Sequence, residues 1–220
     1  MENVKIIALR ESVFEDNNAD AKLLRQELSD KGCFLINLMS APGSGKTSTL
    51  RALLPLLSKE LSVAVMEADI DSSVDAEAIA RCGVKAIQLH TGGMCHLDAD
   101  MCRQGLRALA YEEFDLVILE NVGNLVCPAE FDTGAHLNMT ILSVPEGHDK
   151  PLKYPLMYES CGLLVVNKTD VLPYFDFDMD KLREYALMRN PNIEIIPISA
   201  KTGEGIASLA ELILKKVKST

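Results

Sequence analysis

A glycine-containing turn at residues 40–47 limits the possible folds of this chain more than any other stretch. Its sequence is Ser-Ala-Pro-Gly-Ser-Gly-Lys-Thr, and it follows an apolar run at residues 33–39 that suits a buried strand of a parallel sheet. Leucines at helical spacing follow the turn. Gly43 and Gly45 let the backbone curl so that its N–H groups face inward, and a helix N-terminus adds positive potential. The turn therefore predicts a phosphate-binding loop.

The last two residues of the turn carry the chemistry expected of such a loop. Lys46 can reach the outer phosphates of a nucleotide, and the Thr47 hydroxyl can bind Mg²⁺. Ser40 stands where the usual motif has its first glycine, but the strand, the turn, the Lys-Thr pair and the helix occur in the expected order. The loop residues predicted to bind the nucleotide are Gly43, Ser44, Gly45, Lys46, Thr47 and Ser48.

Strand-like and helix-like patterns alternate along the chain. Expected strands lie at residues 33–39, 62–69, 84–89, 115–119, 137–144, 162–166 and 193–198. Expected helices lie at residues 17–31, from 47 onward, and at 74–81, 98–111, 151–160, 178–188 and 206–218. Such alternation implies an α/β fold with a mostly parallel sheet, helices on both faces, and ligands at the carboxyl ends of the strands. We expect one domain over residues 1–220, in which residues 1–32 form an N-terminal extension and a helix.

The bulk composition excludes some function classes. The formal net charge is −10, so a broad nucleic-acid-binding face is not expected. No apolar run approaches the roughly 18 residues that a membrane-spanning helix needs, and the first residues lack the pattern of a signal peptide. We therefore expect a cytoplasmic protein, in which the six cysteines stay reduced and a metal role is favoured over disulfides.

A second motif predicts which base the nucleotide carries. Residues 163–166 form an apolar strand that runs into Asn167-Lys168-Thr169-Asp170, and Asn-Lys-x-Asp in this position resembles the guanine-reading motif of GTPases. One carboxylate can accept both adjacent donors of guanine, whereas adenine offers no such pair. A buried acceptor left without a partner is costly, so such a site can discriminate by about 10⁴-fold. The stem of Lys168 can lie along the base.

Residues 199–201, Ser-Ala-Lys, follow the next apolar strand and resemble the last GTPase motif. In that motif the backbone N–H of the middle residue, here Ala200, meets the guanine carbonyl. Three motifs in order, each at a strand end, favour GTP over ATP. The residues predicted to bind the base are Asn167, Lys168, Asp170, Ser199, Ala200 and Lys201.

Carboxylates at strand ends are the candidates for magnesium binding and catalysis. Asp69 and Glu120 each end an apolar strand, where Mg²⁺ and the attacking water of a GTPase would lie. Mg²⁺ prefers a few hard oxygen ligands plus waters, so Thr47 with one or both of these carboxylates suffices. Asp71 and Asp75 are further candidates, and their alternative role is that of loop and helix-cap carboxylates. Which carboxylate orients the water stays open.

The hydrolysis expected from this site is slow. Residues 120–123, Glu-Asn-Val-Gly, stand where common GTPases carry Asp-x-x-Gly, and nothing directly after them supplies a water-orienting glutamine. Slow intrinsic hydrolysis is the property of a switch. The residues predicted to be catalytic are Lys46, Asp69, Asp75 and Glu120.

A thiol and an imidazole stand side by side at Cys95 and His96, on a loop before an expected helix. Cys127 follows the strand that ends at Glu120 by a few residues, so these side chains lie beyond the ends of neighbouring strands and could converge. Thiolate and imidazole suit Zn²⁺ or Ni²⁺ far better than Mg²⁺. Three ligands do not close a tetrahedral site, and a two-fold axis would supply the missing ligand from a second subunit. The alternative is a set of ordinary reduced cysteines and a surface histidine.

The remaining cysteines and histidines fit structural roles. Buried thiols are expected at Cys33, Cys82 and Cys161. Cys102 lies on an expected helix without an evident partner. His90 is a candidate auxiliary metal ligand, whereas surface or loop positions are expected for His136 and His148.

Three stretches together resemble the hydrogenase nickel-incorporation GTPases, the HypB family. They are the loop with Cys95 and His96, residues 120–128 (Glu-Asn-Val-Gly-Asn-Leu-Val-Cys-Pro) and residues 144–151 (Val-Pro-Glu-Gly-His-Asp-Lys-Pro). The similarity covers roughly residues 33–205. It implies a SIMIBI-type GTPase that dimerises with GTP bound. It also implies that this GTPase helps deliver nickel to the precursor of a nickel-iron hydrogenase, together with a second nickel accessory protein.

The resemblance also implies roles for individual residues. The implied ligands of nickel or zinc at the dimer interface are Cys95, His96 and Cys127. The positions that match the phosphate and Mg²⁺ site are Lys46, Thr47, Asp69 and Glu120, and those that match the base site are Asn167, Asp170 and Ala200. Lys153 is the candidate for a cation that reaches the nucleotide of the partner subunit, with Lys150 as a close rival. The implied cofactors are GTP, Mg²⁺ and either Ni²⁺ or Zn²⁺.

Two other functions are weighed against this one. A urease-type nickel GTPase accessory protein would carry a Cys-Pro-His arrangement, whereas Cys127 is followed by Pro128 and Ala129, which disfavours it. A GTP-dependent regulatory switch with structural cysteines would have no metal role. Nickel titration of the GTP-bound protein separates these alternatives.

Overall fold

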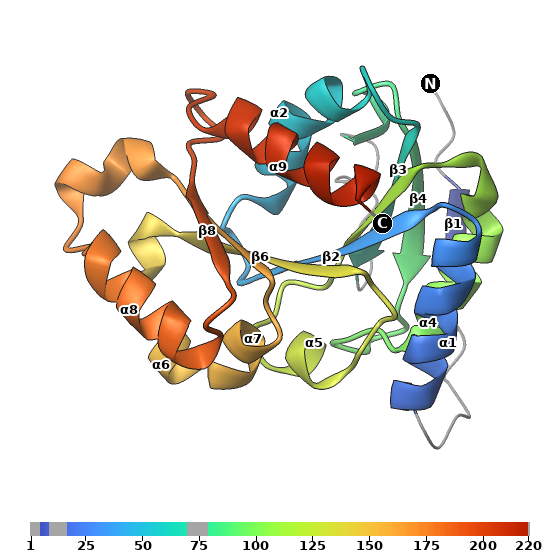
Figure 1. Cartoon of the computed structure of the whole chain (residues 1–220), viewed down its shortest axis with the longest axis horizontal. Coiled ribbons are helices and arrows are strands. Elements are labelled where there is room, and N and C mark those ends of the chain that lie inside the picture. Colours follow the sequence, from blue (N-terminus) through green and yellow to red (C-terminus); the bar gives the residue numbers. More distant parts are fainter. Residues whose placement is uncertain (1–4, 9–16, 70–78, 220) are drawn as a thin grey trace.

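The computed structural model describes residues 5–8, 17–69 and 79–219, and the labels used below are those of Figure 1. Eight strands of the described chain form one sheet. They are β1 (Lys5–Ala8), β2 (Phe34–Ser40), β3 (Val63–Asp69), β4 (Lys85–His90), β5 (Leu116–Glu120), β6 (Leu137–Ser143), β7 (Leu163–Asn167) and β8 (Glu194–Pro197). Their order is β1-β4-β3-β5-β2-β6-β7-β8, and every neighbouring pair is parallel.

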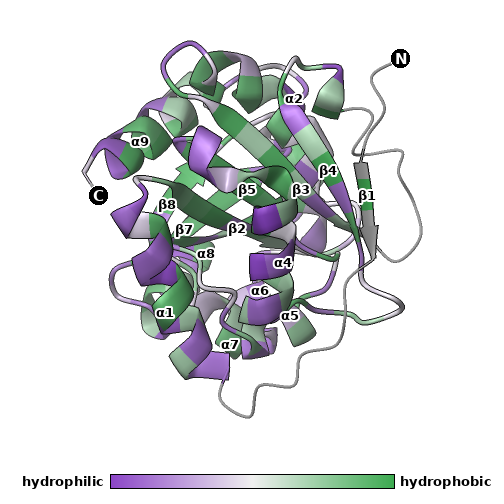
Figure 2. Ribbon diagram, turned by 90° about the vertical axis from the view of Figure 1, so that its right-hand side faces the viewer, coloured by the Kyte–Doolittle hydropathy of each residue, from purple (hydrophilic) through white to green (hydrophobic). Residues whose placement is uncertain are grey.

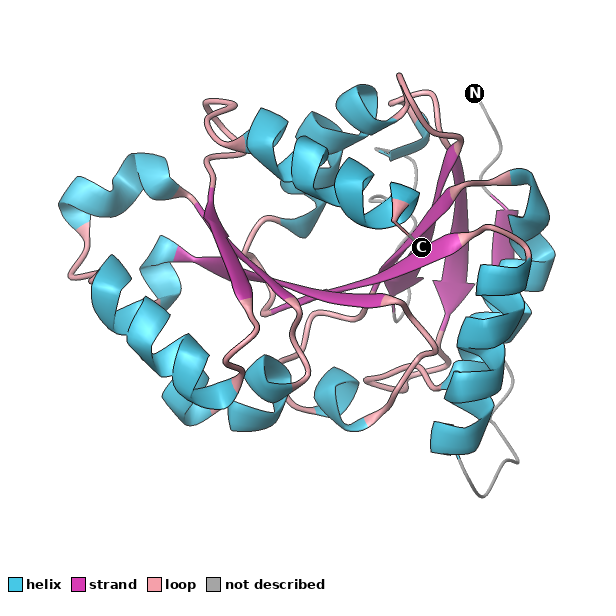
Figure 3. Ribbon diagram, in the orientation of Figure 1, coloured by secondary structure: helices cyan, strands magenta, loops and turns pink. Residues whose placement is uncertain are grey.

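Helices cover both faces of this sheet (Figures 1 and 3). The α-helices are α1 (Asn17–Asp30), α2 (Lys46–Leu57), α4 (Ala99–Leu109), α5 (Cys127–Glu130), α6 (Lys150–Lys153), α7 (Pro155–Glu159), α8 (Met179–Arg189) and α9 (Ile206–Lys218). Short 3₁₀ helices are η1 (Tyr111–Glu113), η2 (Val144–Glu146) and η3 (Thr169–Tyr174). α2 and α9 pack together on one face, while α1, α4, α5, α7 and α8 lie on the other. None of the helices in the described ranges combines the length and apolar character needed to cross a bilayer.

The core forms because the central strands are apolar on both faces and the long helices have one apolar side. On α2, Leu50, Leu53, Leu54 and Leu57 recur at helical spacing and are fully buried. Burying one such side chain contributes roughly 1.5–3 kcal/mol. Figure 2 shows the hydrophobic strands in the middle of the molecule. This packing fixes the ends of the strands, and with them the loops that bear the candidate site.

The chain reverses its direction across the sheet at β2, which places a crevice beside the phosphate loop. β5, β3 and β4 lie on one side of β2, and β6, β7 and β8 lie on the other. In open parallel sheets, ligands bind at such a switch point, outside the carboxyl ends of the strands. Ser40, Glu120 and Asn167 end β2, β5 and β7 and therefore share this edge. The predicted α/β fold with a parallel sheet and helices on both faces is confirmed.

Residues 5–8 form a strand that the sequence pattern does not predict. β1 pairs with β4, with Lys5 opposite Ile87 and Ala8 opposite His90. A strand of four residues is too short to show a clear period, and its hydrogen bonds depend on a strand far along the chain. The N-terminal extension expected for residues 1–32 therefore contributes an edge strand to the sheet.

The prediction of a single helix at residues 151–160 is wrong. The structure has two short helices there, α6 and α7, which meet at Tyr154. Tyr154 has φ −129° and ψ 61°, which is not helical. It precedes Pro155, whose ring disfavours helical backbone in the residue before it and which has no N–H to donate. Most of the helix expected at residues 74–81 lies outside the described residues, which resume at Ile79.

His136, expected at the surface or in a loop, lies half-buried in the loop before β6. Its Nδ1 accepts a hydrogen bond from the backbone N–H of Leu35 at 3.0 Å, and its ring stacks on Phe34 with the centroids 4.9 Å apart. Burial, followed by the positive charge of Arg25, lowers the pKa of His136 below its ordinary value of 6.5. The folded state therefore prefers the neutral imidazole.

We expect His136 to make the folded state less stable in mild acid. Below about pH 6.5 the unfolded chain takes up a proton that the folded chain accepts only at lower pH, so the free energy of unfolding falls as the pH falls. Above that pH the imidazole is neutral in both states and its contribution is complete. His136→Asn keeps an acceptor for the Leu35 N–H but does not titrate, so it should lose less stability between about pH 7 and pH 5. Urea denaturation at both pH values measures the difference, and equal losses contradict the prediction.

Candidate nucleotide and metal site

Two left-handed glycines shape the phosphate loop between β2 and α2. Gly43 has φ 77° and Gly45 has φ 98°, which residues with a side chain rarely adopt. A Cβ on Gly45 would also lie 2.5 Å from Asn167 Nδ2, so the loop requires glycine there. Lys46 begins α2, and its Nζ donates to Ser40 Oγ at 3.1 Å. The serine that replaces the usual first glycine thus holds the lysine beside the loop.

A cavity of about 630 Å³ opens beside this loop. Its lining includes Lys46, Thr47, Glu67, Glu120, Gly123 and Lys168. Thr47 Oγ1 donates to Glu120 Oε1 at 3.4 Å. Both groups are hard oxygen donors of the kind that Mg²⁺ prefers, so this part of the cavity fits the ion. A Cβ on Gly123 would lie 3.5 Å from Lys46 Nζ, so the loop after β5 lies close to the lysine of the phosphate-loop motif.

The other predicted carboxylates fall outside the described side chains. Asp69 is the last residue of β3 and stands opposite His90 in the register with β4, but its side chain is not described. Asp71 and Asp75 lie in the segment 70–78, which is outside the described residues. Their roles in magnesium binding and catalysis remain predictions.

Glu67 is a carboxylate at this cavity that sequence reasoning missed. It lies on β3 opposite Glu120 of β5 in the parallel register, lines the cavity and is 3% exposed. Carboxylates are seldom buried without a partner or a function. The signal was available, because Glu67 is the one charged residue in the apolar run 62–68, and strands buried on both faces read as continuous apolar runs.

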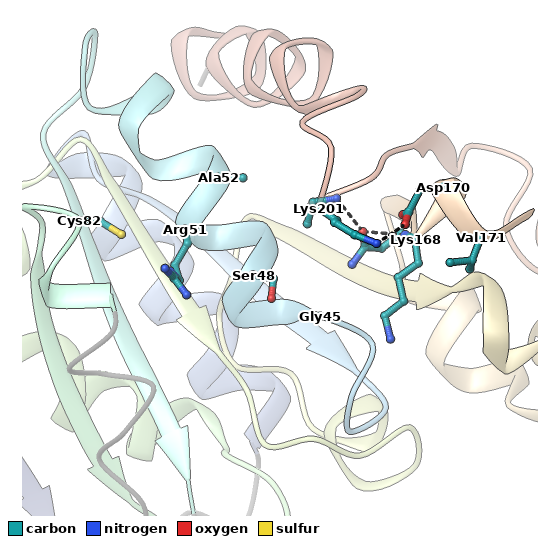
Figure 4. Close-up of a pocket in the computed structure, with 11 residues that line it drawn as sticks. Gly45, Ser48, Arg51, Ala52, Cys82, Lys168, Asp170, Val171 and Lys201 are labelled. Carbon is teal, nitrogen blue, oxygen red and sulfur yellow. Dashed lines mark hydrogen bonds and ion pairs between the residues drawn. The ribbon is translucent and has the colours of Figure 1, made fainter.

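A second cavity, of about 700 Å³, lies on the other side of the loop (Figure 4). Ser48 and Arg51 of α2 lie on one side, and Lys168, Asp170 and Lys201 lie on the opposite side. The two cavities share lining residues of the loop, so they adjoin there. A nucleotide with its phosphates on the loop would place its base in this second cavity.

Asn167 ties the base motif to the phosphate loop. Its Nδ2 donates to the carbonyl of Ser44 at 2.9 Å. Its Oδ1 accepts from the backbone N–H groups of Lys168 at 2.7 Å and Ala200 at 3.1 Å. The Ala200 N–H, predicted to meet the guanine carbonyl, is therefore engaged within the protein at the edge of the cavity. Lys168 Nζ donates to the carbonyl of Gly43 at 2.8 Å, so the lysine stem runs from the base motif to the loop.

The Asp170 carboxylate is held where a base would lie. Its Oδ1 accepts a hydrogen bond from Ser199 Oγ at 2.7 Å, and its Oδ2 lies 3.8 Å from Lys201 Nζ. The side chain is 16% exposed and lines the cavity. The two predicted base motifs, which are separate in the sequence, thus meet at one carboxylate.

The structure brings two of the three predicted metal ligands together. Cys95, in the loop after β4, and Cys127, the first residue of α5, lie close enough for their thiols to interact. The nearby Cys127 side chain, followed by burial, raises the pKa of the Cys95 thiol. Asn124 Nδ2 donates to Cys127 Sγ at 3.3 Å. Two adjacent thiols suit a soft cation, which binds them as thiolates and displaces their protons.

His96 does not join this pair within one chain. Its ring stacks on Phe131, with the centroids 3.8 Å apart and an interplanar angle of 11°. Among the described residues, no three or more His, Cys, Asp or Glu side chains are grouped so as to hold a metal ion. Two thiols leave a metal site open, so ligands from a second chain, or a turn of the His96 ring, are needed to close it.

Three of the other cysteines are buried, and burial keeps their thiols protonated. It raises the pKa of Cys33 and Cys102 to about 12 and that of Cys161 to about 11, so these thiols stay protonated and are poor metal ligands. The prediction of a buried thiol is confirmed for Cys33 and Cys161. It is wrong for Cys82, which is half-buried and lines the base cavity because it lies in the turn before β4.

The two candidate cations for a partner's nucleotide lie on α6, and each has a contact within the chain. Lys153 Nζ lies 2.6 Å from Asp149 Oδ2, and its side chain is 59% exposed. Lys150 Nζ lies over the Tyr154 ring, 5.3 Å from the centroid. An exposed ion pair of this kind contributes at most about 1 kcal/mol, so Lys153 can leave Asp149 when a phosphate is offered.

Glu146, just before this helix, joins the lysine segment to the phosphate loop and was also missed. Its Oε2 accepts hydrogen bonds from Ser44 Oγ at 2.8 Å and from the backbone N–H and Oγ of Ser143, each at 2.7 Å. The sequence signal is a capping box, a serine followed three residues later by glutamate. That local pattern does not predict the contact with Ser44, which lies in the loop after the neighbouring parallel strand β2.

A parallel sheet with a glycine phosphate loop at its switch point, and a base motif tied to that loop, defines a P-loop nucleotide-binding domain. Residues 34–197 match the family described as CobW/HypB/UreG, nucleotide-binding domain. The chain is 44% identical over 202 residues to the hydrogenase maturation factor HypB of Azotobacter vinelandii, which covers 92% of this chain and 67% of that relative. The chain belongs to the HypB family of hydrogenase maturation factors.

Two solved structures are similar over nearly the whole chain. HypB from Helicobacter pylori in complex with nickel has a TM-score of 0.85 and 35% identity, over 92% of this chain and 95% of that one. Hydrogenase maturation factor HypB from Archaeoglobus fulgidus has a TM-score of 0.85 and 33% identity, over 93% of this chain and 100% of that one. The family resemblance found in the sequence motifs is confirmed.

Proposed function

We propose that this chain is a GTP-hydrolysing metallochaperone that binds nickel or zinc at a dimer interface and assists nickel insertion into a nickel-iron hydrogenase precursor. The observation that supports this most is the short segment at residues 120–127. Glu120 at one end contacts Thr47 of the phosphate loop, and Cys127 at the other end pairs with Cys95. A shift at the phosphate end of so short a segment can move a metal ligand.

The nucleotide half of the proposal rests on the two adjoining cavities. Asp170 accepts the paired donors of guanine, while Lys46 and the loop N–H groups neutralise the phosphates. Thr47 and Glu120 would hold Mg²⁺, and the bound ion would stabilise the charge that develops during phosphoryl transfer. Asp69 and Asp75 are proposed to complete the catalytic set. The residues directly after Gly123 include no glutamine, so we propose slow intrinsic turnover.

The metal half rests on sulfur chemistry. Thiolates bind both nickel and zinc, and the solved Helicobacter pylori relative is in complex with nickel. One chain offers two thiols, those of Cys95 and Cys127, and a two-fold axis beside them would bring two more from a second chain. His96 would add an imidazole ligand if its ring left Phe131. Lys153, or its rival Lys150, is proposed to reach the nucleotide of the partner protomer. The binding of the nucleotide and the binding of the metal would then both depend on formation of the dimer.

The same proposal defines the biological context. Residues 1–220 act as one GTPase domain in the cytoplasm, the hydrogenase large-subunit precursor receives nickel, and a second nickel accessory protein takes part. A urease-type accessory protein is disfavoured, because Ala129 rather than histidine follows the Cys127-Pro128 pair. A GTP-dependent regulatory switch with structural cysteines is the alternative from another class.

A non-hydrolysable GTP analogue tests the proposal. With Mg²⁺ and the analogue, we expect the chain to shift from monomer to dimer in analytical ultracentrifugation. In the same samples nickel affinity should change by roughly 5- to 150-fold, the usual size of an allosteric coupling. GDP should produce neither effect. A chain that stays monomeric and binds nickel equally with and without the analogue contradicts the proposal, and a dimer that binds no nickel favours the regulatory switch.

A further inference from the structure

The first residue of α1 contacts two loops that are far apart in the sequence. Asn17 Oδ1 accepts a hydrogen bond from the backbone N–H of Ala99 at 2.9 Å. Asn17 Nδ2 donates to the backbone carbonyl of Asp132, also at 2.9 Å. One carboxamide therefore joins the start of α4 to the loop that follows α5.

Both contacts fall within a few residues, along the chain, of the proposed metal ligands. Ala99 stands three residues after His96, on the loop that also carries Cys95. Asp132 directly follows Phe131, whose ring stacks on His96, and lies five residues after Cys127. The bridge made by Asn17 thus spans the two segments whose thiols lie close together.

We propose that Asn17 is a positioning residue of the metal site, which holds the two ligand-bearing loops in the relation that pairs Cys95 with Cys127. This inference rests on the proposed metal function. Residues that orient metal ligands without touching the ion typically account for 10- to 100-fold in metal affinity.

The Asn17 side chain satisfies a buried backbone donor at the start of α4. Ala99 is the first residue of α4 and is fully buried, and the N–H groups of a helix start have no partner within the helix. The Asp98 side chain accepts from the backbone N–H of Met101 instead. Loss of Asn17 would leave the buried Ala99 donor without its partner, which is costly, so the loop would shift to find another.

α1 itself is anchored by other groups, so removing Asn17 should not release the helix. Asp20 Oδ1 lies 2.7 Å from Arg103 Nη2, and both side chains are about nine-tenths buried. Arg25 makes two hydrogen bonds to the Asp132 carboxylate, at 2.7 Å and 2.8 Å. Tyr111 donates to Glu27 at 2.9 Å. What Asn17 adds is the connection at the end of the helix where the ligands lie.

Nickel titration of the full chain with the GTP analogue and Mg²⁺ tests this role, with Ni²⁺ as the probe and thiolate-to-nickel charge-transfer absorption as the readout. We expect Asn17→Ala to weaken nickel binding about tenfold or more and to alter the charge-transfer band, with affinity for the GTP analogue unchanged. Asn18→Ala, an exposed neighbour on the same helix turn, is the matched control and should match the wild type.

Asn17→Asp decides the case if the alanine variant is unstable. It keeps an acceptor for the Ala99 N–H at a helix start, where a carboxylate is favoured, but it cannot donate to the Asp132 carbonyl. We expect it to fold and to bind nickel more weakly than the wild type. Wild-type nickel affinity in Asn17→Asp overturns the bridging role. If Cys127→Ala instead binds nickel as tightly as the wild type, the proposed metal site itself is refuted.

Discussion

Replacing Asp170 with asparagine is expected to weaken GTP binding on the order of 10⁴-fold. Guanine presents a ring N–H and an exocyclic amine side by side, and both need acceptors. The wild-type carboxylate supplies two, with Oδ1 oriented by the Ser199 hydroxyl at 2.7 Å. Asparagine keeps one acceptor and turns an N–H against the guanine amine. Since the side chain is only 16% exposed, water cannot easily repair the mismatch.

The same substitution should create a preference for xanthine. Xanthine has a ring N–H beside a carbonyl, which matches the acceptor and donor of an asparagine side chain. Fluorescence titration with labelled GTP, in competition with GTP and XTP, measures both effects. Asp176→Asn removes the same charge from an exposed position on the following loop and should leave both affinities unchanged. If Asp170→Asn still prefers GTP over XTP, Asp170 does not read the base.

Replacing Cys127 with alanine is expected to abolish nickel binding at the dimer interface while leaving GTP affinity nearly intact. Cys127 pairs with Cys95, so its loss removes one thiolate from each chain of the proposed dimer and leaves too few sulfur ligands to hold the ion. GTP affinity should survive because Cys127 lines neither of the two nucleotide cavities.

Nickel titration of the analogue-bound protein, followed by thiolate charge-transfer absorption, measures this effect. Cys102→Ala is the matched control. It also removes a thiol, from the helix that follows the Cys95 loop, but burial keeps that thiol protonated. That variant should bind nickel as the wild type does. Equal nickel binding by the Cys127→Ala dimer would remove Cys127 from the ligand set.

Local motifs account for what the sequence could predict about the nucleotide site. The phosphate loop is a contiguous run in which Gly43, Gly45 and Lys46 determine the backbone path and charge, so its geometry follows from neighbouring residues. The same holds for Asn167 and Asp170, whose motif directly follows an apolar strand. Parallel strands bring their carboxyl ends to one edge, which is why these motifs meet in the structure.

The three predicted metal ligands were placed only in part by the sequence. The sequence placed Cys95 and Cys127 beyond the ends of two strands expected to be neighbours, which is wrong, because β3 lies between β4 and β5. The two thiols nevertheless come close together. His96 was expected to converge with them, yet its ring stacks on Phe131. A rotamer depends on which aromatic surface is near, and Phe131 reaches His96 only through the packing of separate loops.

By itself, the sequence determined the fold class, the phosphate loop, the base motif and the HypB family, because periodicity and contiguous motifs act over a few residues. Only the tertiary structure decided that Glu67 stands opposite Glu120, that Glu146 binds Ser44, and that Asn17 bridges the two loops that carry the proposed metal ligands. These polar contacts join residues far apart in the chain. They depend on strand register and on how the crossover helices pack, which no local pattern encodes.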